Sequence, residues 1–191
     1  MPRPRRAQDE VLRTTLDVLA ERGVSGLSVD TVAERAGISK ATIYRHWKSR
    51  AGLIHAAISS VQPEVATPET GTLRGDLIAL LQLLLDYFDS PMIASIFPSL
   101  LDAAVRDPEY AALRQDTLRK GRAEFERAIG RAVKRGELPK RIDKRLLVDL
   151  VRAPVVYRRV VAQVPVTRRE LEAIVDAVLR MFPPDATPKS L

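Results

Sequence analysis

Apolar residues recur with helical spacing along almost all of this 191-residue chain. Leu12, Leu16 and Leu19 lie on one face of a first helix, and similar stripes follow as far as residue 182. Intervals of three and four residues are typical of amphipathic α-helices. We therefore expect an all-α fold of about nine helices.

One segment favours a different element. Residues 155–166 are rich in valine, which prefers β-strands, so a strand is the alternative there. A lone strand would have no partner among helices, and we expect a helix that is interrupted near Pro154.

Glycines, prolines and capping residues divide the pattern into helices. Ser28 and Ser39 are placed to cap helices, Thr167 and Glu170 form a capping box, and Pro98 predicts a kink or break. After a first helix that ends at Gly23, the expected helices are about 29–36, 40–47, 50–62, 73–89, one from 91, 108–135, 143–162 and 168–182.

Residues 63–72 (PEVATPETGT) have the composition of a linker. They predict an N-terminal domain, 1–62, and a larger helical domain, 63–191. The first carries a net charge of +4, from 10 basic and 6 acidic residues, out of +7 for the whole chain. No acidic residue lies between Glu34 and Glu64, so this region favours a polyanionic partner.

Composition excludes other classes of function. The chain has no cysteine, and its two histidines are too few for a histidine-rich metal site, so we expect no metal and no cofactor. No catalytic set or phosphate-binding glycine loop is present, and we expect no enzyme activity. No long apolar stretch or secretory signal is visible, which favours a cytoplasmic protein without a membrane partner.

Residues 28–47 (SVDTVAERAGISKATIYRHW) have the spacing of a helix-turn-helix motif. Two short helices that cross steeply need a small residue at their contact and a permissive backbone at the turn. Ala33 supplies the first and Gly37, four positions later, supplies the second.

The run from Gly37 to Leu53 (GISKATIYRHWKSRAGL) resembles the DNA-binding signature of the tetracycline-repressor (TetR) family. Its features are Tyr44 and Trp47, followed by Lys48 and a small polar residue. Two departures are the tryptophan, where most relatives have Phe or Tyr, and the lack of a carboxylate soon after Arg50. The resemblance implies a three-helix DNA-binding unit followed by a helical domain for ligand binding and dimerisation.

We expect the helix that begins at Lys40 to lie in the major groove of DNA. Lys40 can donate to guanine, and Ala41 and the Thr42 methyl can contact thymine. Arg45 can read guanine or hold phosphate.

Phosphate contacts are expected around these base contacts. Thr31 can bind through its hydroxyl and its N–H, and the resemblance implies phosphate contacts for Tyr44, His46, Lys48 and Arg50. An N-terminal arm of Arg3, Arg5 and Arg6 is a further candidate.

The last two expected helices carry apolar stripes that suit a four-helix dimer interface, as the resemblance implies, although the same stripes could face the subunit core. The interface candidates are Leu147, Val151, Leu171, Ile174, Val175, Val178 and Leu179.

The middle helices are expected to surround a ligand cavity, again by resemblance. Its candidate residues are Leu84, Phe88, Met92, Phe97, Leu101, Phe125, Arg152 and Tyr157. Arg152 is a charge among apolar neighbours, which could orient a ligand or pair across a dimer.

These observations predict a homodimeric, ligand-responsive transcriptional regulator. We expect a repressor that a small-molecule effector releases from a palindromic operator in double-stranded DNA. The alternatives are a DNA-binding scaffold that acts through protein partners without a ligand, an enzyme, and a basic peripheral membrane protein.

Overall fold

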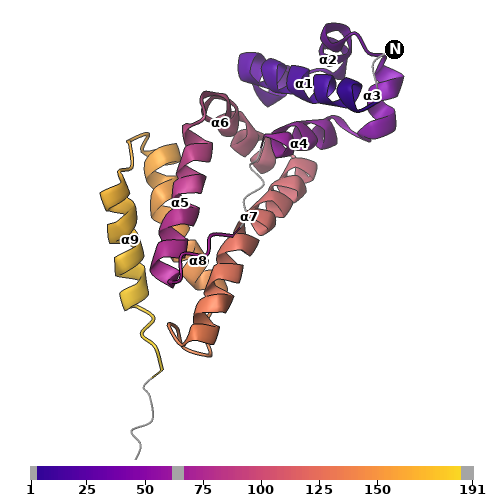
Figure 1. The fold of residues 1–191 in the computed structure, drawn as a ribbon. Helices are drawn as coiled ribbons and strands as arrows, with labels where there is room; N and C mark the ends of the chain where they lie inside the picture. The colour runs from indigo at the N-terminus through magenta and orange to yellow at the C-terminus, as the bar shows by residue number, and fades with distance from the viewer. Residues whose placement is uncertain (1–3, 62–66, 186–191) are drawn as a thin grey trace, which may run out of the picture. The chain divides into compact units, whose positions relative to one another are not determined.

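The computed structural model describes residues 4–61 and 67–185. Nine α-helices and one π-helical turn make up this part of the chain, and it contains no strand (Figure 1). The helices are α1 (Pro4–Gly26), α2 (Val29–Ala36), α3 (Lys40–His46), α4 (Arg50–Ser60), α5 (Leu73–Asp89), α6 (Pro91–Arg106), α7 (Pro108–Arg135), α8 (Lys144–Val156) and α9 (Arg168–Arg180), with the π-helical turn η1 (Tyr157–Val161) after α8.

Glycines end or break helices where the sequence predicts. Gly23 interrupts α1 with a φ of 65°, and Gly136 follows the last residue of α7 with a φ of 79°. The capping box of Thr167 and Glu170 opens α9. The all-α expectation is therefore confirmed.

Neither Pro98 nor Pro154 ends the helix that contains it. Pro98 lies inside α6, which continues through it without a break. Both Pro98 and Ala94 are exposed, so water can satisfy the carbonyl that the missing N–H leaves free. Pro154 also lies inside α8. The interruption falls three residues later, where the N–H of Ala162 bonds the Tyr157 carbonyl at 2.8 Å across the π-helical turn.

The helices pack into two units that do not follow a single cut in the sequence. Unit 1 contains the residues up to Glu64 together with Ser90–Thr117, and unit 2 contains Val65–Asp89 and Leu118–Leu191. In unit 1, Ile96 of α6 and Tyr110 of α7 are buried in the same core as α1–α4. The predicted boundary at residues 62 and 63 follows the linker, whereas α6 and the start of α7 pack with the N-terminal helices.

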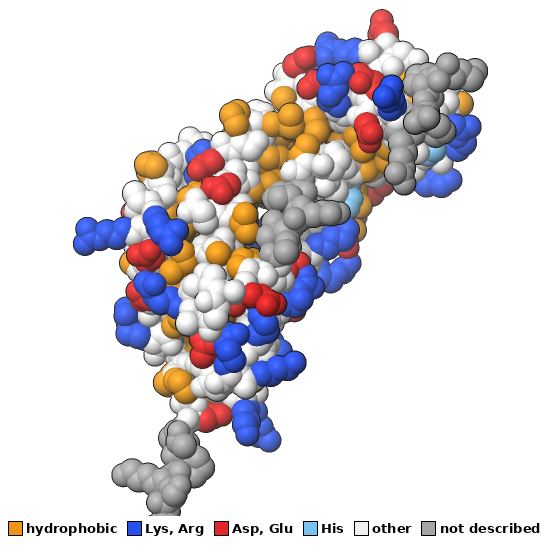
Figure 2. All heavy atoms as spheres, in the orientation of Figure 1, with side chains coloured by type: hydrophobic (Ala, Val, Ile, Leu, Met, Phe, Trp, Pro, Cys, Tyr) orange, Lys and Arg blue, Asp and Glu red, His pale blue; other side chains and the backbone are white. Residues whose placement is uncertain are grey.

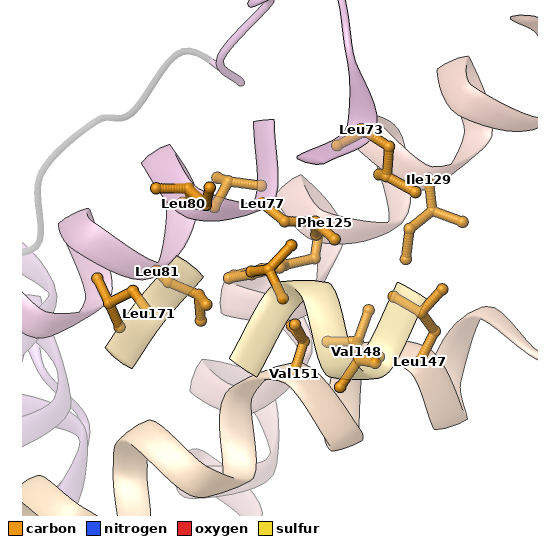
Figure 3. Close-up of a cluster of buried hydrophobic side chains, with 14 of the residues drawn as sticks. Leu73, Leu77, Leu80, Leu81, Phe125, Ile129, Leu147, Val148, Val151 and Leu171 are labelled. Atoms are coloured by element: carbon orange, nitrogen blue, oxygen red, sulfur yellow. The ribbon is translucent and has the colours of Figure 1, made fainter. Parts of the chain in front are cut away.

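Unit 2 is built around apolar side chains from α5, α7, α8 and α9. In Figure 3 these side chains gather between the helices, and they form one buried cluster. Their burial supplies the main stabilisation of the unit, at roughly 25 cal/mol per Å² of apolar surface.

A buried carboxylate fixes the start of α5. Asp76 is fully buried and accepts hydrogen bonds from the N–H and hydroxyl of Thr70, at 2.7 and 2.8 Å, and from Arg131 Nη2, at 3.1 Å. Burial raises the pKa of Asp76, but the bonds from Thr70 and Arg131 outweigh burial and leave it below its usual value. The ionised form is thus the one that unit 2 stabilises.

In the described part of the chain, no single helix is long and apolar enough to cross a bilayer. The pair α5 and α6 meets the length and composition criteria only when the two helices are taken together. A search of the same residues finds no group of three or more potential metal ligands.

We expect Asp76→Asn to lower the free energy of unfolding by about 2–4 kcal/mol, because Arg131 loses the charge of its buried partner. Urea denaturation measures the loss, and Asp86→Asn is the matched control, since Asp86 is exposed and accepts only from Gln82. The wild-type stability should also fall as the pH drops below about 4, because the pKa of Asp76 is lower in the folded than in the unfolded chain. An equal effect of both substitutions would contradict this role.

Candidate nucleic-acid interface

The crossing of α2 and α3 is set by short-range hydrogen bonds. The Ser28 hydroxyl accepts from the N–H of Thr31 at 3.0 Å and so caps α2. Gly37 ends the helix in the left-handed conformation, with φ 65° and ψ 31°. The N–H of Ile38 then bonds the Ala33 carbonyl at 3.0 Å, which is the pattern of a Schellman motif.

The third helix begins two residues after this turn. The Ser39 hydroxyl accepts from the N–H of Thr42 at 3.3 Å and caps α3. Ile43 is 1% exposed and anchors α3 in the core of unit 1. Because one face of this short helix is fixed by Ile43, the opposite face is held toward solvent.

The exposed face of α3 carries most of the predicted DNA contacts. Lys40, Ala41, Tyr44, Arg45 and His46 are all exposed. Figure 2 shows blue Lys and Arg side chains gathered at the edge of the molecule where Figure 1 places α3. The helix therefore presents one basic, hydrogen-bonding surface.

Charge on this surface is only lightly neutralised. Lys40 forms an ion pair with Asp30 of α2, in which both side chains are largely exposed. Arg45 and Lys48 have no ion pair with any described carboxylate. An exposed pair such as Lys40 with Asp30 contributes little stability, so DNA could displace the carboxylate at low cost.

Two predicted contacts are partly occupied by the protein itself. The N–H of Thr31 already donates to Ser28, and its hydroxyl lies 2.8 Å from the Ser28 hydroxyl. Only the hydroxyl of Thr31 is therefore left as a phosphate ligand. Thr42 is half-buried, and its hydroxyl lies 3.0 Å from that of Ser39.

Arg50 has a structural role that its sequence position does not reveal. It is half-buried, its Nη1 donates to the Leu27 carbonyl at 3.1 Å, and its guanidinium lies 6.0 Å from the centre of the Tyr110 ring. The predicted phosphate contact must therefore compete with these interactions, whereas Lys48 is exposed.

Residues far along the chain complete the site. Gln8 Nε2 lies 3.1 Å from His46 Nδ1 and connects α1 to α3. Ser49 caps α4 by accepting from the N–H of Gly52 at 3.0 Å, and its hydroxyl donates to Glu109 of α7. Glu109 thus supplies a carboxylate near the start of α4, where the local sequence lacks one. Local sequence contained no signal for either long-range contact.

The N-terminal arm is only partly within the described chain. Arg3 lies outside the described residues, and Arg6 is an exposed residue of α1. A DNA contact by Arg3, Arg5 or Arg6 stays a prediction.

The predicted dimer residues lie mainly in the core of unit 2. Side chains of Leu147, Val151 and Leu171 point inward in Figure 3. Leu147, Val151, Leu171, Val175 and Val178 are all buried within the chain, and Ile174 and Leu179 are half-buried against the same core. A second copy could not reach the five buried residues without unfolding unit 2, so their assignment to an interface is corrected here. Amphipathic stripes have the same spacing in either role.

The predicted cavity residues fall in both units. Met92, Phe97 and Leu101 belong to unit 1, where Met92 packs against the core. Leu84, Phe88 and Phe125 are in unit 2, as are Arg152 and the exposed Tyr157.

An open hollow of about 450 Å³ lies elsewhere, along α1 and α2. None of the predicted cavity residues lines it. Its lining residues are Glu10, Arg13, Thr14, Asp17, Ala20, Glu21 and Arg35.

A capped helix pair with a left-handed glycine turn and a basic exposed second helix defines a helix-turn-helix DNA-binding protein. Two family models match the chain. The model of bacterial regulatory proteins of the tetR family covers residues 11–57, and the model of the tetracyclin repressor-like C-terminal domain covers residues 67–178. The chain belongs to the TetR family of transcriptional regulators.

Individual relatives agree with this assignment. An uncharacterised HTH-type transcriptional regulator of Mycobacterium tuberculosis is 33% identical over 174 residues, which cover 90% of this chain and 85% of the relative. A DNA-binding transcriptional repressor TetR of Mycobacteroides abscessus is 35% identical over 153 residues, with 78% and 79% covered. The crystal structure of the TetR family transcription regulator SCO0332 has a TM-score of 0.70 and 27% identity, and covers 91% of this chain and 97% of that chain. The family is one of DNA-binding regulators and not of enzymes, as the sequence predicts.

Arg50→Met and Lys48→Met should separate structural from DNA-binding roles. We expect Arg50→Met to lower the free energy of unfolding by about 1–3 kcal/mol, because the buried Leu27 carbonyl loses a charged donor. Lys48→Met should change stability by less than about 0.5 kcal/mol, because Lys48 is exposed and has no ion pair among the residues that the structure describes. Chemical denaturation measures both, and equal stabilities would refute the assigned role of Arg50.

Proposed function

We propose that the chain is a homodimeric repressor that binds a palindromic operator and leaves it when a small-molecule effector binds unit 2. The observation that carries DNA recognition is the exposed face of α3, which presents Lys40, Tyr44 and Arg45 beside Lys48. A helix of this kind fits the major groove, with base contacts near its N-terminus and phosphate contacts around them. The M. abscessus relative is named a repressor, which supports repression over activation.

Dimerisation is proposed because one helix-turn-helix unit contacts few base pairs. Two half-sites about one helical turn apart give useful specificity, and a two-fold dimer matches a palindrome. The dimer surface proposed in place of the buried residues is an exposed apolar stripe on α8 and η1. It contains Leu146, Tyr157 and Val161, which are 48%, 60% and 67% exposed.

This stripe follows helical spacing. Leu146, Leu150, Ala153 and Tyr157 recur at intervals of four, three and four residues, which places them on one face. On α9, Ala173 and Ala177 are exposed one turn apart, and Met181 follows with 61% exposure. Two copies could bury these faces against each other without disturbing the core of unit 2.

The effector is proposed to act by preferring one arrangement of the dimer over another. Its differential affinity for the two arrangements sets the largest change it can make in operator affinity. An effector-free scaffold that acts through protein partners is the alternative. We place the protein in the cytoplasm, where its DNA target lies.

DNA recognition is tested by selecting bound fragments from random duplexes and measuring variants on the consensus. We expect a two-fold symmetric consensus. Lys40→Ala should reduce the discrimination between bases at particular positions of the operator by about 1–3 kcal/mol. Lys48→Ala should weaken binding to all sequences alike and lower the slope of log affinity against log salt concentration by about one. Lys134→Ala, an exposed lysine of α7, is the charge-matched control and should bind like wild type. Failure to bind any duplex at low salt would refute DNA recognition, and unchanged preference in Lys40→Ala would refute the docking of α3.

Dimerisation is tested with the double variant Leu146→Asp/Tyr157→Asp in sedimentation equilibrium. We expect wild type to be a dimer and the variant a folded monomer, because two carboxylates would have to be desolvated in the apolar interface. Val105→Asp is the control, since Val105 is 82% exposed and lies on α6, outside the stripe. A variant that still dimerises would place the interface elsewhere.

A further inference from the structure

Four arginines in unit 2 have a buried Nε without a hydrogen-bond partner in the described chain, and the charges of two of them, Arg122 and Arg152, repel each other. Arg122 lies on α7 and Arg152 on α8, and both are half-buried. The Nε of each is buried and has no hydrogen-bond partner among the described residues. The Arg152 guanidinium lies 5.4 Å from the centre of the Phe125 ring, and Phe125 is 3% exposed.

Positive charge exceeds negative charge in this cluster. Arg122 Nη2 lies 3.0 Å from Asp149 Oδ1, and Asp149 is 51% exposed. Arg152 forms no ion pair with any described carboxylate. Arg145 Nε also lies 3.9 Å from Asp149, so two arginines share this carboxylate and the charge of Arg152 remains uncompensated.

The local environment disfavours that remaining charge. Burial lowers the pKa of the Arg152 guanidinium, the charge of Arg122 lowers it further, and Asp149 opposes both. A half-buried cation without a partner is destabilising, whereas stacking on an aromatic ring compensates only part of the cost. Arg152 therefore keeps a charge that no carboxylate in the described chain pairs with.

The Arg152 guanidinium lies close to α7 at Gly121. Gly121 of α7 is exposed, and a Cβ placed on it would lie 3.5 Å from Arg152 Nη2. A longer side chain at this position would extend over the guanidinium. The glycine thus places no side chain over Arg152 Nη2.

We propose that Arg152, assisted by Arg122, binds the carboxylate of a small organic anion, and that the effector of the proposed repressor belongs to this class. The planar fork of an arginine matches a carboxylate in bidentate geometry. A guanidinium without a carboxylate partner in the described chain matches a monoanion. The second part of this inference rests on the proposed function.

Isothermal titration calorimetry of the full chain with octanoate, octanamide and inorganic phosphate tests the site. We expect octanoate to bind wild type at least 10-fold more tightly than octanamide or phosphate. Arg152→Gln should remove the preference for octanoate over octanamide, and Arg152→Lys should restore it only in part because the fork is lost. Arg145→Gln is the matched control, since Arg145 is an exposed arginine two turns before Arg152 on α8 and lies 3.9 Å from Asp149. It should bind octanoate within 2-fold of wild type.

A second variant tests access without removing charge. Gly121→Leu favours the helix, so the protein should remain folded, and its side chain should weaken octanoate binding at least 5-fold. If both Gly121→Leu and Arg152→Gln bind octanoate with wild-type affinity, the proposed site is wrong. Phosphate binding as tight as octanoate would overturn the carboxylate assignment.

Sedimentation and DNA titration separate the remaining outcomes. If Arg152→Gln turns a wild-type dimer into a monomer and octanoate does not bind wild type, Arg152 pairs with a second copy and the proposal is wrong. If octanoate binds through Arg152 and lowers operator affinity, both parts hold. If it binds but leaves operator affinity unchanged, the effector assignment fails and the site stands. If wild type binds octanoate through Arg152 but binds no duplex DNA, the proposed function fails while the anion site stands.

Discussion

The left-handed turn at Gly37 is the constraint on which recognition depends. It lets Ile38 bond back to the Ala33 carbonyl, so α2 ends at Ala36 and α3 begins four residues later, at Lys40. A Cβ at Gly37 would meet no atom of the described chain within 4 Å but would strain the backbone, because L-residues rarely adopt this φ. The crossing of the two helices is thus set by backbone chemistry, and the DNA-facing side chains follow from it.

Much of the secondary structure could be predicted because its signals are local. Each of these signals depends on residues only a few positions apart. They are the N-terminal caps at Ser28 and Ser39, the capping box at Thr167, and the glycines that end helices, Gly37 and Gly136. The same locality explains the exposed face of α3, since Ile43 fixes which side is buried. Pro98 does not break α6, because an exposed helix side can hydrate the carbonyl that a proline leaves free.

Other features depend on contacts that local sequence does not encode. The stripe through Leu147, Val151 and Leu171 suits a core as well as an interface, and only the fold shows that it is core. The structural role of Arg50 depends on Tyr110, sixty residues later, and the carboxylate near the start of α4 comes from Glu109. The DNA-binding function could be predicted although these contacts could not, because the residues of the helix-turn-helix motif are contiguous in the sequence.

The division into units has a consequence for how such a protein can be rearranged. The chain passes from one unit to the other after Glu64, Asp89 and Thr117, so each core is made from two separate stretches of sequence. A fragment that ends at the linker would lack Ile96 and Tyr110 and would open the core around α1 and α4. Chimeras that exchange DNA specificity between relatives should therefore transplant α6 and the start of α7 along with the first four helices, or keep the recipient's core residues on both stretches.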